Sequence, residues 1–375
     1  MALAFLLVYS KWKLWVSLPL HGFFVAMVVL LLCFLPINLL AVKLRFGRTG
    51  EFKILQMADR HYADGKTTPC LNMLPSQVHG CSDLNTTKRT AHPNSPLIVF
   101  TGDNIFGSDT KNSAKSLNAA FAPAIAAEIP WAAKHIVGLK HTLFQVNLSE
   151  ARIIDGFDNY NLEVGGVEGS SFANNSVLNL YFLDSGDHSI VPSICGYGWI
   201  KTFSTAVNVY MRLPMAQKSS VLGLVYFHIP LPEFASFDVS NFTGVRQEGI
   251  SLASINSGFF TTMVEAGDVK VIFTGHDHLN DFCGQMTRIQ LSYAGGFGYH
   301  AYGKVGWSRR ARVVVASLEK TDEGGWGAVK SIKTWKRLDD GHLTIIDEQV
   351  LWSKNLFLKF DFAIYLEGLR CENFI

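Results

Sequence analysis

Five short apolar runs, rich in β-branched and aromatic residues, do most to restrict the fold of this chain. Each run is apolar at nearly every position rather than at alternate positions, which is typical of strands covered on both faces. The runs are Phe52–Ala58, Pro96–Phe100, Val177–Leu183, Leu222–Phe227 and Val269–Phe273. Helical or loop stretches separate them, and this alternation predicts an α/β or α+β layered domain.

The other regular segments complete one domain. Ser113–Ala127 is rich in alanine and begins with polar residues, so it is predicted to be a helix. Ala311–Glu319 and Ala328–Leu338 are predicted to be antiparallel strands that close the fold. Because there is neither an internal repeat nor a low-complexity linker, we expect a single domain over residues 51–352, followed by a tail (353–375) without clear periodicity.

The N-terminal segment, residues 1–48, has the composition of a membrane span. Leu14–Val42 contains no Asp, Glu, Lys or Arg, and Gly22–Leu35 is almost wholly apolar. A bilayer core needs about 20 mainly apolar residues. The segment is predicted to be an uncleaved signal anchor, with a signal peptide cleaved near Leu39–Ala41 as the alternative. Either form would send the chain into the secretory pathway, as a membrane-anchored protein with a lumenal or extracellular domain or as a secreted or vacuolar one.

Glycosylation signals and cysteines agree with that route. Four N-x-Ser/Thr sequons occur, at Asn85, Asn147, Asn174 and Asn241. Cys70 and Cys81 lie in a loop rich in Pro, Ser, Asn and Gly, where a lumenal disulfide could form. The absence of any C-x-x-C pattern argues against a zinc knuckle or a thioredoxin-type site.

The charge pattern gives no reason to expect a nucleic-acid partner. The formal net charge is only +2, and basic and acidic residues are well mixed along the chain. A basic face for DNA or RNA is therefore not expected.

Groups able to bind metal follow four of the five apolar runs. The second and fifth runs share one form, a β-rich run followed by Thr-Gly and a metal-binding group, and their ends could meet across one sheet. Sites in α/β folds are commonly built at the carboxyl ends of strands. Carboxylates and imidazoles without thiolates suit iron, zinc or manganese. The groups are Asp59 and His61, Asp103 and Asn104, His228, and His276 and His278.

Each of these residues alone has a simpler explanation. A lone Asp after a strand is commonly a turn or cap residue, and a lone His such as His228 is commonly a surface or core imidazole. The Gly275–His278 turn is more specific because it brings two imidazoles to one glycine turn. The ordered set D-x-H, G-D-N, H and G-H-D-H is more specific again. One Asp can bridge two metals and support in-line attack on phosphorus, so the set predicts a binuclear hydrolytic site.

With these motifs, residues Phe52–Trp352 resemble the plant purple acid phosphatases, in particular their short branch with a D-x-H first motif, within the calcineurin-like metallophosphoesterases. The resembling stretches include KTTPC, SDLNTT, HIPLPEF, NFTGVRQEGI, GGFGYHAYGKVGWSRRARVV and KTWKRL. The resemblance implies an α/β four-layer sandwich, two mixed β-sheets flanked by helices, that acts on small phosphate esters. It also implies a binuclear metal centre at the sheet edge, iron together with zinc, manganese or a second iron.

The resemblance assigns roles to individual residues. Phe106 stands where the larger purple enzymes have a tyrosine that colours the iron, so purple colour is not expected. The resemblance also implies which residues hold the metals. The first metal would be held by Asp59, His61 and His278, and the second by His228 and His276, with Asp103 as the bridge between them.

Weaker candidates surround this set. Asn104 could contact phosphate, although an Asn that caps a turn is the better explanation. Tyr299 and His300 could line the pocket, with a plain glycine-rich loop as the alternative. Asp277 and Asp281 are expected to accept hydrogen bonds from the site imidazoles.

One family motif is absent. After the third strand the family has GNHD or GNHE, whose Asn holds the second metal and whose His stabilises or protonates the leaving oxygen. Here Ile129–Leu139 reads IPWAAKHIVGL and is predicted to pass from the strand into the following helix, and no GNH occurs in the chain. His135, the nearest imidazole, is expected to belong to that helix. The sequence therefore predicts a weakened phosphatase or, as the alternative, a catalytically inactive, membrane-tethered glycoprotein that binds through a phosphatase fold.

Overall fold

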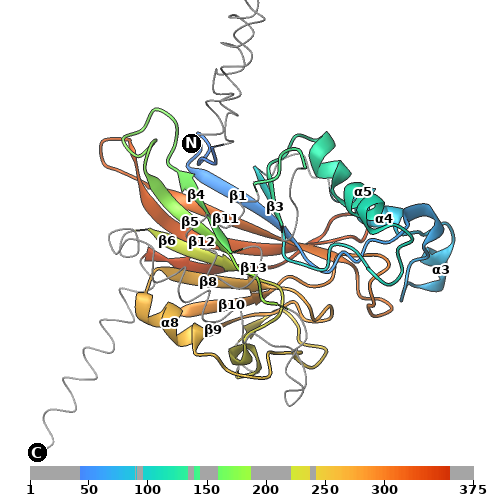
Figure 1. Ribbon diagram of the computed structural model, residues 1–375. Helices are drawn as coiled ribbons and strands as arrows, with labels where there is room; N and C mark the ends of the chain where they lie inside the picture. The colour runs from blue at the N-terminus through green and yellow to red at the C-terminus, as the bar shows by residue number, and fades with distance from the viewer. Residues whose placement is uncertain are drawn as a thin grey trace, which may run out of the picture. The chain divides into compact units, whose positions relative to one another are not determined.

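The computed structural model describes residues 43–88, 90, 96–133, 139–143, 159–186, 221–236 and 242–354 (Figure 1). Almost all of the predicted N-terminal segment and C-terminal tail lie outside these ranges, as do His135, Asn147 and Asn241. Within the described ranges, no helix is both long and apolar enough to cross a membrane. The predicted anchor therefore stays an expectation.

A six-stranded mixed sheet forms one layer of the domain. Its strand order is β13-β12-β11-β1-β2-β3. The first three strands of the chain pair in parallel, and β11 joins β1 antiparallel before leading into β12 and β13. The bounds are β1 Glu51–Met57, β2 Leu97–Phe100, β3 Trp131–Ala133, β11 Arg310–Lys320, β12 Trp326–Leu338 and β13 Ile345–Ser353.

A seven-stranded mixed sheet forms the second layer, with the order β4-β5-β6-β8-β10-β9-β7. Its central strands β5, β6, β8 and β10 run parallel, and β4, β9 and β7 are antiparallel additions at its edges. The bounds are β4 Tyr160–Gly165, β5 Ser176–Phe182, β6 Leu222–Tyr226, β7 Phe242–Thr243, β8 Val269–Thr274, β9 Cys283–Met286 and β10 Ile289–Tyr293.

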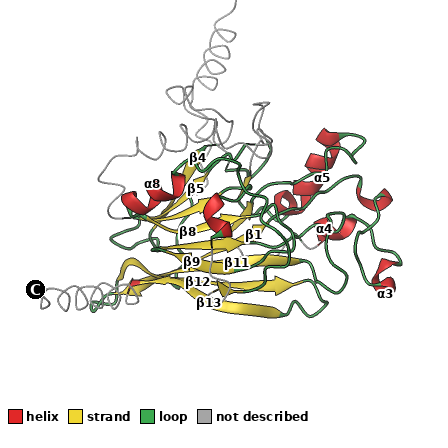
Figure 2. Ribbon diagram, turned by 90° about the horizontal axis from the view of Figure 1, so that it is seen from below, coloured by secondary structure: helices red, strands yellow, loops and turns green. Residues whose placement is uncertain are grey.

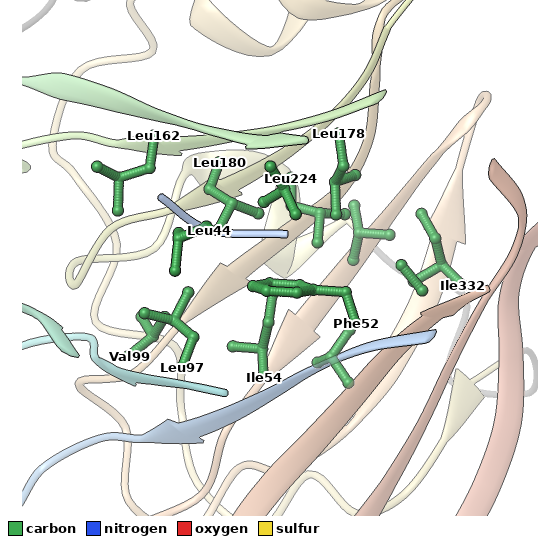
Figure 3. Close-up of a cluster of buried hydrophobic side chains, with 14 of the residues drawn as sticks. Leu44, Phe52, Ile54, Leu97, Val99, Leu162, Leu178, Leu180, Leu224 and Ile332 are labelled. Carbon is green, nitrogen blue, oxygen red and sulfur yellow. The ribbon is translucent and has the colours of Figure 1, made fainter. Parts of the chain in front are cut away.

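The main hydrophobic core lies between the two sheets (Figure 3). Successive strand residues point to opposite faces, so Phe52 and Ile54 of β1 enter this core while Leu55 and Met57 enter a different cluster on the outer face. Leu44 and Phe46, which precede the predicted start of the domain, are also buried between the sheets. Cover on both faces explains why these strands are apolar at nearly every position.

Few helices cover the sheets (Figure 2). Helix α5, Ser113–Ala126, packs on the outer face of the six-stranded sheet, where Phe121 stacks on Trp131 with ring centroids 4.4 Å apart. Helix α8, Phe259–Ala266, packs on the outer face of the seven-stranded sheet. The remaining described helices are short: α3 Pro75–Val78, α4 Leu84–Lys88, η2 Gly65–Thr67 and η4 Pro232–Ala235.

The predicted elements that fall on described residues are present within a residue or two of their expected bounds. All five apolar runs are strands, Ser113–Ala127 is helix α5, and the two closing segments are the antiparallel pair β11 and β12. The possible disulfide between Cys70 and Cys81 is formed, with 5.7 Å between the Cα atoms. Two sequons are described: Asn174 is exposed, whereas Asn85 is half-buried and donates to Cys81 Sγ at 3.3 Å.

Candidate metal centre

The six predicted ligands converge from both sheets. Asp59, His61 and Asp103 follow β1 and β2 of the six-stranded sheet, while the other three ligands, His228, His276 and His278, follow β6 and β8 of the seven-stranded sheet. The expectation that the second and fifth runs meet across one sheet is therefore wrong. Their carboxyl ends meet between stacked sheets, and Gln56 Nε2 of β1 crosses the gap to donate to Thr274 O of β8 at 3.3 Å.

Asp59, His61 and His278 form one triad, here called the inner triad. Their ligand atoms all lie within 4.8 Å of one another. His61 Nε2 is 3.2 Å from His278 Nε2, and His278 Nε2 is 3.6 Å from Asp59 Oδ1. Two imidazole nitrogens and a carboxylate therefore point at one small volume.

Asp103, His228 and His276 form a second triad, here called the outer triad. His228 Nε2 is 3.3 Å from Asp103 Oδ2 and 3.3 Å from His276 Nδ1. Asp103 Oδ2 is also 3.2 Å from His61 Nε2 of the inner triad. Asp103 thus lies between the two groups, where a bridging carboxylate would stand.

The backbone at the centre adopts conformations that L residues rarely take. Asp59, His61, Asp103 and His276 have φ angles of 53°, 42°, 42° and 81°. Such conformations cost on the order of 1–3 kcal/mol each and cluster at functional sites, where the surrounding structure holds them. At these four of the six ligand positions, the strained backbone directs the side chain into the centre.

The Thr-Gly pair before each motif has a steric reason. Gly102 has φ +129°, and a Cβ atom there would lie 2.4 Å from the ring of His228. A Cβ atom on Gly275 would lie 2.8 Å from Ala58 Cβ and 3.0 Å from Asp59 Oδ2. Each glycine therefore leaves room for a metal-ligand side chain from the opposite sheet: Gly102 for His228 and Gly275 for Asp59.

Backbone carbonyls fix the tautomers of two ligands. His228 Nδ1 lies 3.1 Å from Thr101 O, and His278 Nδ1 lies 2.8 Å from Tyr302 O. A carbonyl oxygen can only accept, so Nδ1 carries the proton in each neutral ring and Nε2 directs its lone pair into the centre. Such carbonyl contacts are typical of metal-binding histidines.

Burial and charge set the protonation of the centre. Burial raises the pKa of Asp59 to about 7, against the attraction of His228. Burial, with repulsion from His61, lowers the pKa of His278 to about 3, so this ring is neutral at neutral pH. Burial also opposes ionisation of Asp103, but His228 and His61 outweigh it and hold the pKa of that carboxyl well below its usual range.

The donor set fits bound metal ions. Asp59 Oδ2 is buried and has no hydrogen-bond partner among the described residues. A buried carboxylate oxygen left in this way is costly unless a cation satisfies it. Mixed carboxylate and imidazole ligands suit iron, zinc and manganese.

The two triads differ in exposure. Asp59 is fully buried and His278 is 2% exposed, whereas 41% of the Asp103 side chain is exposed and His276 is half-buried.

The third strand, β3, ends at Ala133, and the chain is described again from Leu139, where His141 O accepts from Trp131 N at 3.1 Å. The predicted helix after β3 falls largely on residues outside the described ranges.

The weaker candidates have other roles in the structure. His300 uses both ring nitrogens, on Pro69 O at 2.9 Å and Asp109 Oδ2 at 3.0 Å. The Tyr299 hydroxyl donates to Asp339. Asn104 directly follows Asp103 in the chain, and its Oδ1 is buried and unpartnered within the described part of the chain.

The expectation for Asp277 and Asp281 is wrong. Asp277 accepts from Tyr293 Oη at 2.6 Å and Ser251 N at 3.2 Å, and Asp281 pairs with Arg310 and Lys336. Both carboxylates face the protein behind the turn, and the carbonyls of Thr101 and Tyr302 support the imidazoles instead.

Sequence reasoning missed Tyr302 and Glu248. The Tyr302 ring stacks on His278 with centroids 3.7 Å apart, and its hydroxyl donates to Glu248 at 3.1 Å. Both residues lie in stretches that carry the family resemblance, GGFGYHAYG and NFTGVRQEGI, but neither is a usual metal ligand. Phe106, where the larger enzymes have tyrosine, packs edge-on against His61 with ring centroids 5.1 Å apart.

Comparison with known proteins gives close relatives. No family model matches the chain. It is 57% identical over 358 residues to a protein of Arabidopsis thaliana named "Probable inactive purple acid phosphatase 29", covering 86% of this chain and 92% of that protein. It is 48% identical to "Probable inactive purple acid phosphatase 14" of the same species, covering 86% and 89% of the two chains.

A solved dimetal phosphatase from Danio rerio aligns over 81% of this chain and 99% of its own length, with a TM-score of 0.47 and 15% identity. The Arabidopsis proteins are similar over nearly their whole length. The chain therefore belongs to the purple acid phosphatase family.

Proposed function

We propose that this chain holds two metal ions at the inner and outer triads and hydrolyses small phosphate monoesters slowly. The observation that carries the proposal is the placement of Asp103 Oδ2 within 3.3 Å of histidines from both triads. Such an arrangement suits a pair of metals that share one carboxylate. When bound, the pair would polarise the ester and supply a nucleophile at neutral pH.

Each residue of the site would have a separate role in binding the metals or the substrate. Asp59, His61 and His278 would hold the first metal, and Asp103 would bridge. His228 and His276 would hold the second metal, with the His228 tautomer set by Thr101 O. Asn104, whose buried Oδ1 lacks a described partner, directly follows Asp103 in the chain and could orient a phosphate ester through its amide nitrogen.

Slow hydrolysis follows from what the chain lacks. The GNH motif is absent, so the outer triad has no Asn ligand and the leaving oxygen has no motif histidine. General acid groups typically contribute about 10² to 10⁴ in rate. The metal pair would be iron with zinc, manganese or a second iron, and colourless because Phe106 replaces the tyrosine.

A second candidate is a phosphate-binding protein without catalysis. It is supported by the missing motif and by the names of the Arabidopsis relatives, which describe those proteins as inactive. In this form the same triads would hold metal and bind a phosphate group without turnover.

We further propose that the domain is lumenal or extracellular and glycosylated. The apolar N-terminal segment, the four sequons and the Cys70–Cys81 disulfide support this location. Endoglycosidase treatment of the full chain from a secretory host should increase its mobility on a gel. Unchanged mobility, together with digestion by protease added on the cytosolic side, would contradict the location.

Metal content and turnover measured on the same sample decide between the two functions. The full chain, purified in detergent, should contain bound metal and turn over a generic aryl phosphate slowly. Metal without any turnover above solvent would favour the binding protein. A chain that neither retains nor takes up metal would overturn both.

A further inference from the structure

Tyr302 contacts the metal-ligand candidate His278 in three ways. Its ring stacks on the imidazole, with centroids 3.7 Å apart and planes 13° apart. Its carbonyl oxygen accepts from His278 Nδ1 at 2.8 Å, and its hydroxyl oxygen accepts from the His278 backbone N–H at 3.2 Å. One residue therefore restrains the plane of the ring, its tautomer and its backbone.

Glu248 fixes the Tyr302 hydroxyl. The hydroxyl donates to the Glu248 carboxylate, with oxygen distances of 3.1 and 3.2 Å. The same carboxylate accepts from the Leu279 N–H at 2.6 Å, one residue after His278. The four residues thus close a ring of contacts from Tyr302 through His278 and Leu279 to Glu248 and back.

The loop that carries Tyr302 is itself fastened. Arg309, which is 4% exposed, donates to the carbonyls of Tyr302 at 3.1 Å, Ala301 at 2.8 Å and Leu71 at 2.9 Å. Gly303 N donates to Asn72 Oδ1 at 3.0 Å. Leu71 and Asn72 lie within the loop closed by the Cys70–Cys81 disulfide. These contacts therefore fix the backbone of the loop at Tyr302, whose ring packs on His278.

We propose that Tyr302 and Glu248 are a positioning pair that raises the affinity of the inner triad for its metal. The inference rests on the proposed function, since it assumes that the inner triad binds metal. A ligand already held in its binding rotamer and tautomer loses less freedom when the metal binds. Groups that support metal ligands in this way typically contribute about 10- to 100-fold in metal affinity.

Because Tyr302 is partly exposed, an effect of this residue on metal affinity can be distinguished from an effect on folding. Its side chain is 44% exposed, so its loss removes little buried apolar surface. Substitutions at exposed positions usually change stability little. A positioning role therefore changes metal affinity while the metal-free protein unfolds at nearly the same temperature.

The test measures zinc affinity of the full chain by competition with a chelating dye, starting from metal-free protein. Tyr302→Ala, Tyr302→Phe and Glu248→Gln are compared with the wild type. Val305→Ala is the matched control, because Val305 lies in the same loop and is 52% exposed. Thermal unfolding of each metal-free variant checks the fold, and the absorption spectrum with Co²⁺ in place of zinc reports ligand geometry.

Tyr302→Ala should weaken the tighter zinc site about 10- to 100-fold and alter the Co²⁺ spectrum. Tyr302→Phe and Glu248→Gln should have smaller effects because the stacked ring remains, and Val305→Ala should have none. Equal zinc affinity in the wild type and Tyr302→Ala would overturn the inference alone. A wild type that binds no metal would overturn the proposed function and this inference with it.

Discussion

The inner and outer triads differ in how firmly the fold holds them. Asp59 and His278 of the inner triad are buried, and Tyr302 and Glu248 support His278 from outside. In the outer triad, Asp103 is partly exposed and the strand that carries the missing motif in the family ends at Ala133. Every ligand that is present stands next to a core strand, whereas the missing Asn would come from a loop. Loops tolerate such changes because fewer packed contacts depend on them.

The largest effect should come from restoring the missing group to the outer triad. Insertion of a strand end and loop bearing GNHD between Ala133 and Lys134 would supply both the Asn ligand and the leaving-group histidine. Turnover of an aryl phosphate should rise by about 10² to 10⁴. An insertion bearing GAAD in place of GNHD is the control. If the unmodified chain is already as fast as ordinary enzymes and the insertion adds nothing, the outer triad is not the defective half.

Removing a ligand from each triad should separate the two metals. His278→Ala should remove the tighter metal, because it deletes a ligand of the buried triad, whereas His276→Ala should spare that metal and weaken only the looser one. Metal analysis after dialysis against a weak chelator measures both. Retention of the same metal content by His278→Ala and the wild type would show that the inner triad is structural only.

A buried ion cluster behind the Gly275–His278 turn should matter for folding rather than for either metal. Asp281 Oδ2 lies 2.6 Å from Arg310 Nη1 and 2.8 Å from Lys336 Nζ, and all three side chains are buried. Asp281→Asn leaves these cations without their shared carboxylate and should cost about 3–5 kcal/mol in the free energy of unfolding. Denaturant unfolding measures this cost. Zinc affinity of the folded variant should stay at the wild-type value, and a large loss would tie the cluster to the metal centre.

The same carboxylate gives a pH dependence. Burial opposes ionisation of Asp281, but Lys336 and Arg310 outweigh it and hold its pKa below the usual value. A carboxyl with a depressed folded pKa stabilises the protein above its unfolded pKa of about 3.9, and this contribution is lost as pH falls further. As the pH is lowered, the free energy of unfolding should therefore fall more steeply for the wild type than for Asp281→Asn. Denaturant unfolding at a series of acidic pH values measures this difference.

The smallest effect should come from the disulfide loop, and it should fall on one triad. Cys70 and Cys81 are 11 residues apart, and a loop of that size contributes about 3 kcal/mol in the chain-entropy account. Cys70→Ser with Cys81→Ser should lower the unfolding temperature and weaken the tighter zinc site more than the looser one, because the loop holds the segment of Tyr302. Equal weakening of both sites would contradict the link between this loop and the inner triad.

The sequence predicts the strands of this fold that are apolar at nearly every position. Near-continuous apolarity marks β1, β2, β5, β6 and β8, and all five are found. Strand β13 was missed because Ile345–Ser353 is a polar edge strand, in which Ile345 and Val350 are 49% and 45% exposed. Only Leu351 and Trp352 of β13 are buried, so the strand lacks a near-continuous apolar run.

For the candidate site, the sequence predicts which residues gather but not how they are supported. The six ligands could be found because each follows an apolar run in a recognisable motif. The run alone does not reveal which sheet its strand joins, so the meeting of two sheets was missed. Asp281 was misjudged because proximity to His278 in sequence does not determine where its side chain points. Tyr302 was missed because it lies 24 residues beyond His278.

Stepwise titration of the metal-free full chain with zinc measures whether this fold keeps a firm inner triad beside a loose outer one. A first ion should bind tightly and a second more weakly, with His278→Ala removing the tight step and His276→Ala the weak one. Two equally tight steps, or a tight step that survives His278→Ala, would contradict this expectation.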